Sequence, residues 1–200
     1  VNTITNITTG KVWMDRNLGA TQVAISNTDQ LAYGSLYQWG RGSDGHQLIT
    51  WSSSTSGTAV NATTATLSSS DVPGNTNFIL APNPPYDWHS AQNVNLWQGV
   101  TGINNPCPSG YRIPTETEWN AELTSWGSPN TTGAFNSLKL PLAGFVGNSG
   151  GSLNNVGTRG RYWSSTVNST NSQGLDFLSS GVGMNAYYRA FGFSVRCIKD

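Results

Sequence analysis

One stretch in the middle of the chain has a clear helical pattern of hydrophobic positions. Trp119, Leu123 and Trp126 recur at positions i, i+4 and i+7, which places three apolar side chains on one helical face. Thr115 and Glu118 precede them as a capping box, in which each side chain bonds an unpaired backbone N–H of the first turn. A glycine and a proline follow closely and end the pattern. We predict a helix of about three turns here.

The other hydrophobic segments are short and separated by Gly, Ser and Asn, which is typical of β-strands. The first is predicted over Lys11–Gly19, a strand that ends at a glycine turn and contains the good strand formers or core residues Val12, Trp13 and Met14. Later strands are predicted over Leu138–Leu142, Arg161–Val167, Leu175–Leu178 and Phe193–Ile198. In the last of these, alternate residues are apolar, which predicts a half-buried strand with Cys197 on its inner face.

Two regions have weaker patterns. Asp29 to Trp39 is predicted to form a short helix or turn that packs on the core. Residues 42–105 show little periodicity, and a plain loop of this length is unusual in a compact domain. Because this stretch contains Trp88 and Trp97, we expect an irregular but ordered insertion that packs against the domain.

The order of the elements favours an α+β fold, because helical segments come first and short antiparallel strands follow. The 200 residues fit a single domain over 1–200, with 42–105 inserted within it. We expect four tryptophans to lie in the core: Trp13, Trp39, Trp119 and Trp163.

The charge content is low for a protein without an apolar span. Only 10% of residues are charged, and Ser, Thr, Asn and Gly carry most of the polarity. No run of about eighteen apolar residues is present, so we expect no membrane span. No basic stripe is present to bind phosphates, so we expect no nucleic-acid partner.

No motif of a catalytic site is present. Phosphate-binding glycine motifs and a serine nucleophile elbow are absent, and His89 is interpreted as a surface residue of a polar loop. The three glutamates all lie on the predicted helix, where acids favour the helix dipole, which argues against a glycosidase carboxylate pair. No dense Asp/Glu cluster is available for calcium, although asparagine and carbonyl oxygens could hold one ion. We expect no cofactor and no metal.

The two cysteines, Cys107 and Cys197, either form a disulfide that closes a large loop or remain buried free thiols. A composition rich in Asn, Ser and Thr with few charges suits an exported protein, which favours the disulfide.

Aromatic residues are concentrated near the C-terminal end, where Tyr187, Tyr188, Phe191 and Phe193 surround Arg189. Tyr and Arg are enriched among interface anchors and in antibody paratopes. Since neighbouring strand residues point to opposite sides, we expect at least one of the two tyrosines to be exposed. Phe193 fits either the core or a contact surface.

Five motifs occur in a fixed order along the chain: Val12–Gly19, Tyr33–Gly40, Cys107–Thr115, Tyr162–Thr166 and Gly192–Cys197. This ordered set resembles the Fibrobacter succinogenes major paralogous domain, a secreted bacterial domain. That family is related to the C-type lectin and formylglycine-generating-enzyme fold. The resemblance implies two helices around small antiparallel sheets, with residues 42–105 as a long insertion.

Residues 161–197 resemble, more narrowly, the variable region of proteins diversified by retroelements, in which a reverse transcriptase substitutes adenines of a template. Such proteins keep scaffold motifs and vary positions between them. The resemblance implies these variable, ligand-binding positions: Arg161, Gly174, Asp176, Leu178, Gly181, Gly183, Asn185, Ala186, Tyr187, Tyr188, Phe191 and Phe193. Adenine changes in an Asn codon cannot give Lys, Glu, Gln, Met or Trp, and none of these positions from Gly174 onward carries one.

The resemblance implies an exported module that presents a variable face to a protein or glycan ligand on another cell or host surface. Its expected place is extracellular, on the cell surface or on a phage tail. The calcium-lectin sugar motifs Glu-Pro-Asn and Gln-Pro-Asp are absent, so calcium-dependent sugar binding is not implied. Two alternatives stay open: an enzyme of the formylglycine-generating or carbohydrate-active type, and a structural pilus or phage-tail module. Because Cys107 and Cys197 resemble a structural pair, we do not expect an enzyme.

Overall fold

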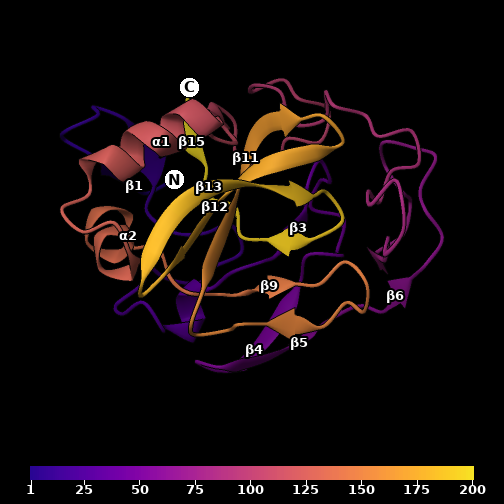
Figure 1. Cartoon of the computed structure of the whole chain (residues 1–200), viewed down its shortest axis with the longest axis horizontal. Helices are drawn as coiled ribbons and strands as arrows, with labels where there is room; N and C mark the ends of the chain where they lie inside the picture. The colour runs from indigo at the N-terminus through magenta and orange to yellow at the C-terminus, as the bar shows by residue number, and fades with distance from the viewer.

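The computed structural model describes residues 1–200 and shows an α+β fold, with two helices beside several small sheets. All strand pairs but one are antiparallel; the exception joins β6 to β7. Figure 1 shows both helices on one side and the insertion spreading over the other. Neither helix has the length and apolar character that crossing a membrane requires.

Helix α1 (Glu116–Ser125) begins at the predicted capping box, in which Thr115 and Glu118 each bond the other's backbone N–H. Trp119 and Trp126 are buried and Leu123 packs against the same core, so the predicted helix is confirmed. Helix α2 (Thr131–Leu138) was not located from the sequence. It contains Gly133, which the fold requires because an added Cβ would lie 1.8 Å from the carbonyl oxygen of Ser128.

The strands form three main sheets. The first joins the two ends of the chain through β1 (Thr3–Thr5), β2 (Val12–Met14), β15 (Ile198–Lys199) and β8 (Tyr111–Arg112). The second contains β10 (Leu153–Asn154), β9 (Phe145–Val146), β14 (Gly192–Phe193) and β3 (Tyr37–Gln38). The third contains the longest strands, β11 (Gly160–Asn168), β12 (Asn171–Leu178) and β13 (Gly181–Tyr188).

The segment 42–105 contains short strands joined by turns and no α-helix. The strands are β4 (Ile49–Ser53), β5 (Ser56–Ala59), β6 (Thr63–Thr64) and β7 (Phe78–Ile79). Trp88 and Trp97 are fully buried, and their indole N–H groups bond the carbonyl oxygens of Trp39 and Arg41. Ahead of this segment, the weak pattern over Asp29–Trp39 corresponds to a single 3-10 turn, Gln30–Ala32, followed by β3.

Two strand predictions are wrong. Leu138 ends α2 and residues 139–142 form no strand, because Lys139 takes a left-handed conformation (φ 53°) and Pro141 lacks a backbone N–H. The predicted strand Phe193–Ile198 is divided between β14 and β15, which lie in different sheets. It is also buried on both sides, since Ser194 and Arg196 are as inaccessible as Cys197.

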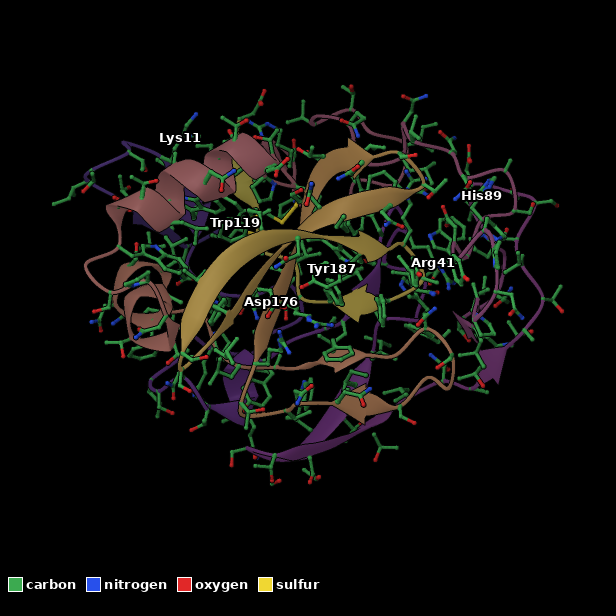
Figure 2. All side chains as sticks on the ribbon, viewed as in Figure 1. Lys11, Arg41, His89, Trp119, Asp176 and Tyr187 are labelled. Carbon is green, nitrogen blue, oxygen red and sulfur yellow. A yellow bond between two sulfur atoms is a disulfide. The ribbon has the colours of Figure 1, made fainter.

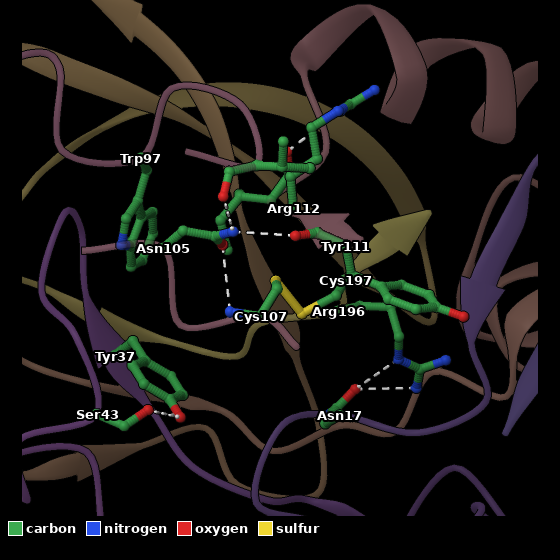
Figure 3. The surroundings of a disulfide bond; sticks show 12 residues. Asn17, Tyr37, Ser43, Trp97, Asn105, Cys107, Tyr111, Arg112, Arg196 and Cys197 are labelled. Carbon is green, nitrogen blue, oxygen red and sulfur yellow. Dashed lines mark hydrogen bonds between the residues drawn. A yellow bond between two sulfur atoms is a disulfide. The ribbon is translucent and has the colours of Figure 1, made fainter. Parts of the chain in front are cut away.

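The core has two large parts, on either side of β11. Trp13 and Trp119 belong to one part, Trp39 and Trp163 belong to the other, and all four are fully buried as predicted. Cys107 and Cys197 form a disulfide that ties the segment before α1 to the C-terminal end, and Figure 3 shows its surroundings. The disulfide alternative is therefore the one the structure contains, and no free cysteine remains.

Candidate functional site

The strand register of the third sheet places most of the predicted variable positions on one face. Arg161 of β11 pairs with Asp176 of β12, which pairs with Gly183 of β13, and directly opposed residues point to the same side. Alternation along the strands then adds the remaining members of this face, Gly174, Leu178, Gly181, Asn185 and Tyr187. We call this surface the Asp176 face.

Two predicted positions point the other way. Ala186 and Tyr188 lie opposite Gln173 and Asn171, on the reverse side of β13. Phe191 and Phe193 follow the strand, and their rings turn back to pack against Tyr187 on the Asp176 face. Most of the predicted variable positions therefore lie on one surface, and those near the C-terminal end of β13 lie on both sides of this strand.

Asp176 is the centre of the polar contacts on this face. Its carboxylate accepts hydrogen bonds from Arg159 Nε (2.6 Å), Arg161 Nε (3.3 Å) and the Tyr187 hydroxyl (2.5 Å). The side chain is only 5% exposed, so these donors replace the water that a carboxylate would otherwise bind. Figure 2 shows Asp176 and Tyr187 close together near the middle of the molecule.

These contacts also fix the protonation of Tyr187. Burial, reinforced by the hydrogen bond to the Asp176 carboxylate, raises the pKa of the Tyr187 phenol. The hydrogen bond to Asp176 is also the main cause that raises the pKa of Arg159. Near neutral pH this tyrosine is a neutral donor held in one orientation, which suits a preorganised contact surface and not a proton-transfer group.

Arg161 lies among aromatic rings. Its guanidinium carbon is 4.0 Å from the centre of the Phe145 ring, 4.7 Å from that of Tyr187 and 5.4 Å from that of Phe193. Arginine in this position is attracted to the ring faces while keeping its hydrogen bond to Asp176. The group combines flat apolar area with a fixed positive charge, the two features of an interface anchor.

A second aromatic group continues this surface towards the insertion. Tyr188 stacks on Tyr86 with ring centres 4.1 Å apart, and Phe191 lies parallel to Tyr188 at 6.1 Å. Tyr188 is 37% exposed, so the prediction that one of the two tyrosines is exposed is confirmed. Tyr86, which belongs to residues 42–105, thus supports an exposed ring of the predicted variable region.

Not every predicted position is available to a ligand. Phe193 is fully buried and stacks on Trp163, which places it in the core. Gly174 is covered by the Tyr187 ring, because an added Cβ would lie 3.2 Å from Tyr187 Cδ2. Asn185 is exposed, as are Ala186 and Tyr188, while Gly181 and Gly183 leave the other end of β13 without side chains on this face.

Sequence reasoning missed three residues of the site: Tyr86, Phe145 and Arg159. Tyr86 and Phe145 stand outside the predicted variable region, and only the fold brings them to it. Arg159 lies two residues before Arg161, the spacing of one strand face, and this is the signal that could have found it.

The structure corrects the prediction for His89 and buries both histidines. His89 is buried, not on the surface, and its Nε2 lies 3.1 Å from Asp71 Oδ1. His46 Nδ1 lies 2.6 Å from Asp44, while its Nε2 accepts the N–H of Gln38. Burial lowers the pKa of His46 to about 4, so this imidazole stays neutral near pH 7 and holds backbone in place.

The glutamates serve the structure of α1 and the segments around it. Glu118 completes the capping box and accepts two hydrogen bonds from Arg112. Glu122 is fully buried, where its Oε1 accepts from Asn6, Trp126 and Ser137. No three His, Cys, Asp or Glu side chains gather in an arrangement that could hold a metal ion.

Comparison with known proteins gives one partial match. Residues 125–198 match the model of a domain of unknown function, DUF8237. The matched segment begins at the end of α1 and includes β11, β12, β13 and the Asp176 face. The comparisons with curated proteins and with solved structures find no match.

Proposed function

We propose that this protein is an exported binding module whose ligand contacts the Asp176 face and the adjoining Tyr86–Tyr188 stack. The ligand is a protein or glycan on another cell or host surface, and the module acts outside the cell, on the cell surface or on a phage tail. One observation carries the proposal. The strand register gathers most of the predicted variable positions on one face, beside an arginine held among aromatic rings.

The fold that we propose is C-type lectin-like, related to the Fibrobacter succinogenes major paralogous domain and to the formylglycine-generating enzyme. Two helices beside small antiparallel sheets, with the ends of the chain paired in one sheet, support this assignment. Diversification by a retroelement would then change side chains on the Asp176 face while the tryptophan core stays constant. A neighbouring reverse-transcriptase gene with a near-identical, Asn-rich template repeat is the genomic feature to look for.

The composition of the site suggests how it recognises ligands. Arg161 and Arg159 share the single carboxylate of Asp176, which leaves this centre one net positive charge and therefore only a weak field to steer a ligand. Flat rings and hydrogen-bonding groups contact a ligand mainly by shape. We therefore expect binding that depends weakly on salt, and a steep salt dependence would count against this surface.

The test begins with the labelled chain on a glycan array and on intact bacterial and host cells. Variants Tyr188→Ala and Arg161→Ala are compared with Ile25→Ser, which changes an apolar residue that is 81% exposed and lies outside the third sheet. We expect the two face variants to lose binding while the control keeps it. Thermal unfolding of each variant separates lost contacts from lost structure, and unchanged binding in both folded face variants would overturn the proposal.

The enzyme alternative makes a different prediction for the cysteines. A thiol reaction of the formylglycine-generating type needs a free thiol, whereas Cys107 and Cys197 are bonded to each other. Thiol titration of the native protein should therefore detect no reactive sulfur. A titratable, reactive thiol would favour the enzyme.

A further inference from the structure

Strand β13 forms an open edge of the third sheet. Its only strand partner is β12, and no backbone hydrogen bond joins residues 181–188 to any other strand. Figure 1 shows β13 running across the front of the molecule, with β12 as its hairpin partner. One row of its backbone groups therefore has no partner within the chain.

The hairpin register identifies these groups. Leu178 pairs with Gly181 around a two-residue turn, so hydrogen-bonded and non-hydrogen-bonded pairs alternate from there. The alternation directs the backbone groups of Val182, Met184, Ala186 and Tyr188 away from β12. None of these four N–H groups donates a hydrogen bond in the structure, and only the Tyr188 carbonyl is engaged, by Phe191 N–H.

This edge lacks the features that normally prevent strand addition. Its eight pairs with β12 are continuous without a bulge, and the strand contains no charged residue and no proline. Asn185, Ala186 and Tyr188 are exposed, so the C-terminal half of the edge is reachable from both faces. A long, uncharged and regular edge is a template for another strand.

We propose that β13 pairs antiparallel with β13 of a second copy of this chain, with the two-fold axis at Ala186. In that register Ala186 faces its own copy and Met184 faces Tyr188, whose N–H is unpaired and whose carbonyl would be shared with the Phe191 N–H. The formal net charge of zero and the uncharged strand mean that two copies approach without repulsion. The small side chain of Ala186 lets the strands come together at the axis.

The consequence is a larger binding surface. A two-fold axis perpendicular to the paired sheets turns both Asp176 faces to the same side, which joins two three-stranded sheets into one of six strands. Pairing through the backbone of β13 does not depend on the proposed ligand binding. The pairing would also survive sequence changes on the Asp176 face, to which Ala186 does not belong.

Sedimentation of the full chain from micromolar to millimolar concentration tests the pairing. We expect a concentration-dependent dimer, and Ala186→Pro should weaken it by at least about tenfold, because each copy loses a bonding N–H at the axis. The matched control Ala186→Ser keeps the N–H and should dimerise like the unchanged chain. A wild-type chain that stays monomeric, or a folded Ala186→Pro variant that dimerises as well as Ala186→Ser, would overturn the proposal.

A cross-link provides a second measurement that does not depend on how proline affects folding. Directly opposed residues in a hydrogen-bonded antiparallel pair lie about 5.5 Å apart at Cα, within the range of a disulfide. Ala186→Cys should therefore form a covalent dimer under mild oxidation. Asn120→Cys, on an exposed position of α1, is the control. Equal cross-linking of both variants, or none at position 186, contradicts the pairing.

Discussion

At the scale of single residues, the site depends on how one buried carboxylate is satisfied. Asp176 is held by two arginines and one tyrosine, and Arg161 and Tyr187 in turn carry the aromatic contacts. Breaking this centre should loosen the whole face, because each donor would lose its charged acceptor inside a partly dry environment.

Asp176→Asn tests this centre. The amide keeps the shape but loses the charge, so we expect a loss of about 1–3 kcal/mol in the free energy of unfolding, measured with urea. The pKa of Tyr187 should also fall, because its proton no longer bonds a carboxylate. Asp200→Asn, which removes a half-exposed ion pair with Arg112, should cost no more than about 1 kcal/mol. Equal losses in both variants would contradict the central role of Asp176.

The sequence could predict only part of this residue-scale picture. The exposure of one tyrosine of the pair Tyr187 and Tyr188 follows from the two-residue period of a strand, and the burial of Trp163 follows from the large apolar area of its indole ring. The sequence misplaces His89, because a polar stretch of sequence predicts an exposed loop, whereas the fold buries this imidazole. Asp71 comes to His89 from another part of the insertion. The stacking of Tyr86 on Tyr188 cannot be predicted either, because only the fold brings these two distant residues together.

At the scale of elements, sequence patterns within one or two turns predict secondary structure well, whereas the pairing of strands that are distant in the sequence is not predicted. The helix cap needs only residues within one turn, and both of its hydrogen bonds are present. The predicted strand Leu138–Leu142 does not form although its leucines alternate, because alternation predicts an extended chain but does not supply a partner strand. The prediction of one strand over Phe193–Ile198 is wrong because this segment passes from one sheet to another. Arg196 is buried there, and its guanidinium bonds Asn17 and the Leu138 carbonyl.

The cap of α1 should make stability depend on pH. Burial alone would raise the pKa of Glu118, but hydrogen bonds from Arg112 and Thr115 outweigh it and lower the pKa to about 2. The stabilisation is therefore fully present above the ordinary value near 4.5 and is lost as the pH falls towards 2.

We expect Glu118→Gln to be less stable at neutral pH and to show a flatter decline in its free energy of unfolding as the pH falls below about 4.5. Denaturant unfolding at several pH values measures this. Glu116→Gln changes a carboxylate in the same turn that makes no hydrogen bond, so its acid profile should follow that of the unchanged chain. Identical profiles for Glu118→Gln and the unchanged chain would show that the cap does not act through this charge.

At the scale of the whole molecule, buried charges bind the insertion to the third sheet, which is formed by β11, β12 and β13. Arg189 follows β13 directly, is fully buried and lies 3.3 Å from the buried Asp87. Its guanidinium also bonds carbonyl oxygens at the tip of the hairpin between β11 and β12 and lies 4.9 Å from the Trp39 ring centre. Residues 42–105 are therefore a structural support of the face, which no local pattern in the sequence indicates.

This support can be tested by protease digestion under native conditions. The unchanged chain should resist cleavage within residues 42–105, although much of that segment is irregular, because Trp88 and Trp97 anchor it in the core. Arg189→Met keeps most of the side-chain volume but leaves Asp87 buried without its cation, which we expect to cost about 3–5 kcal/mol and to open the insertion to cleavage. Arg16→Met removes a partly exposed cation paired with Asp15 and should leave the digestion pattern unchanged. Rapid cleavage of the unchanged chain within 42–105 would mean that the insertion is not held by the core, and Tyr86 could then not orient Tyr188.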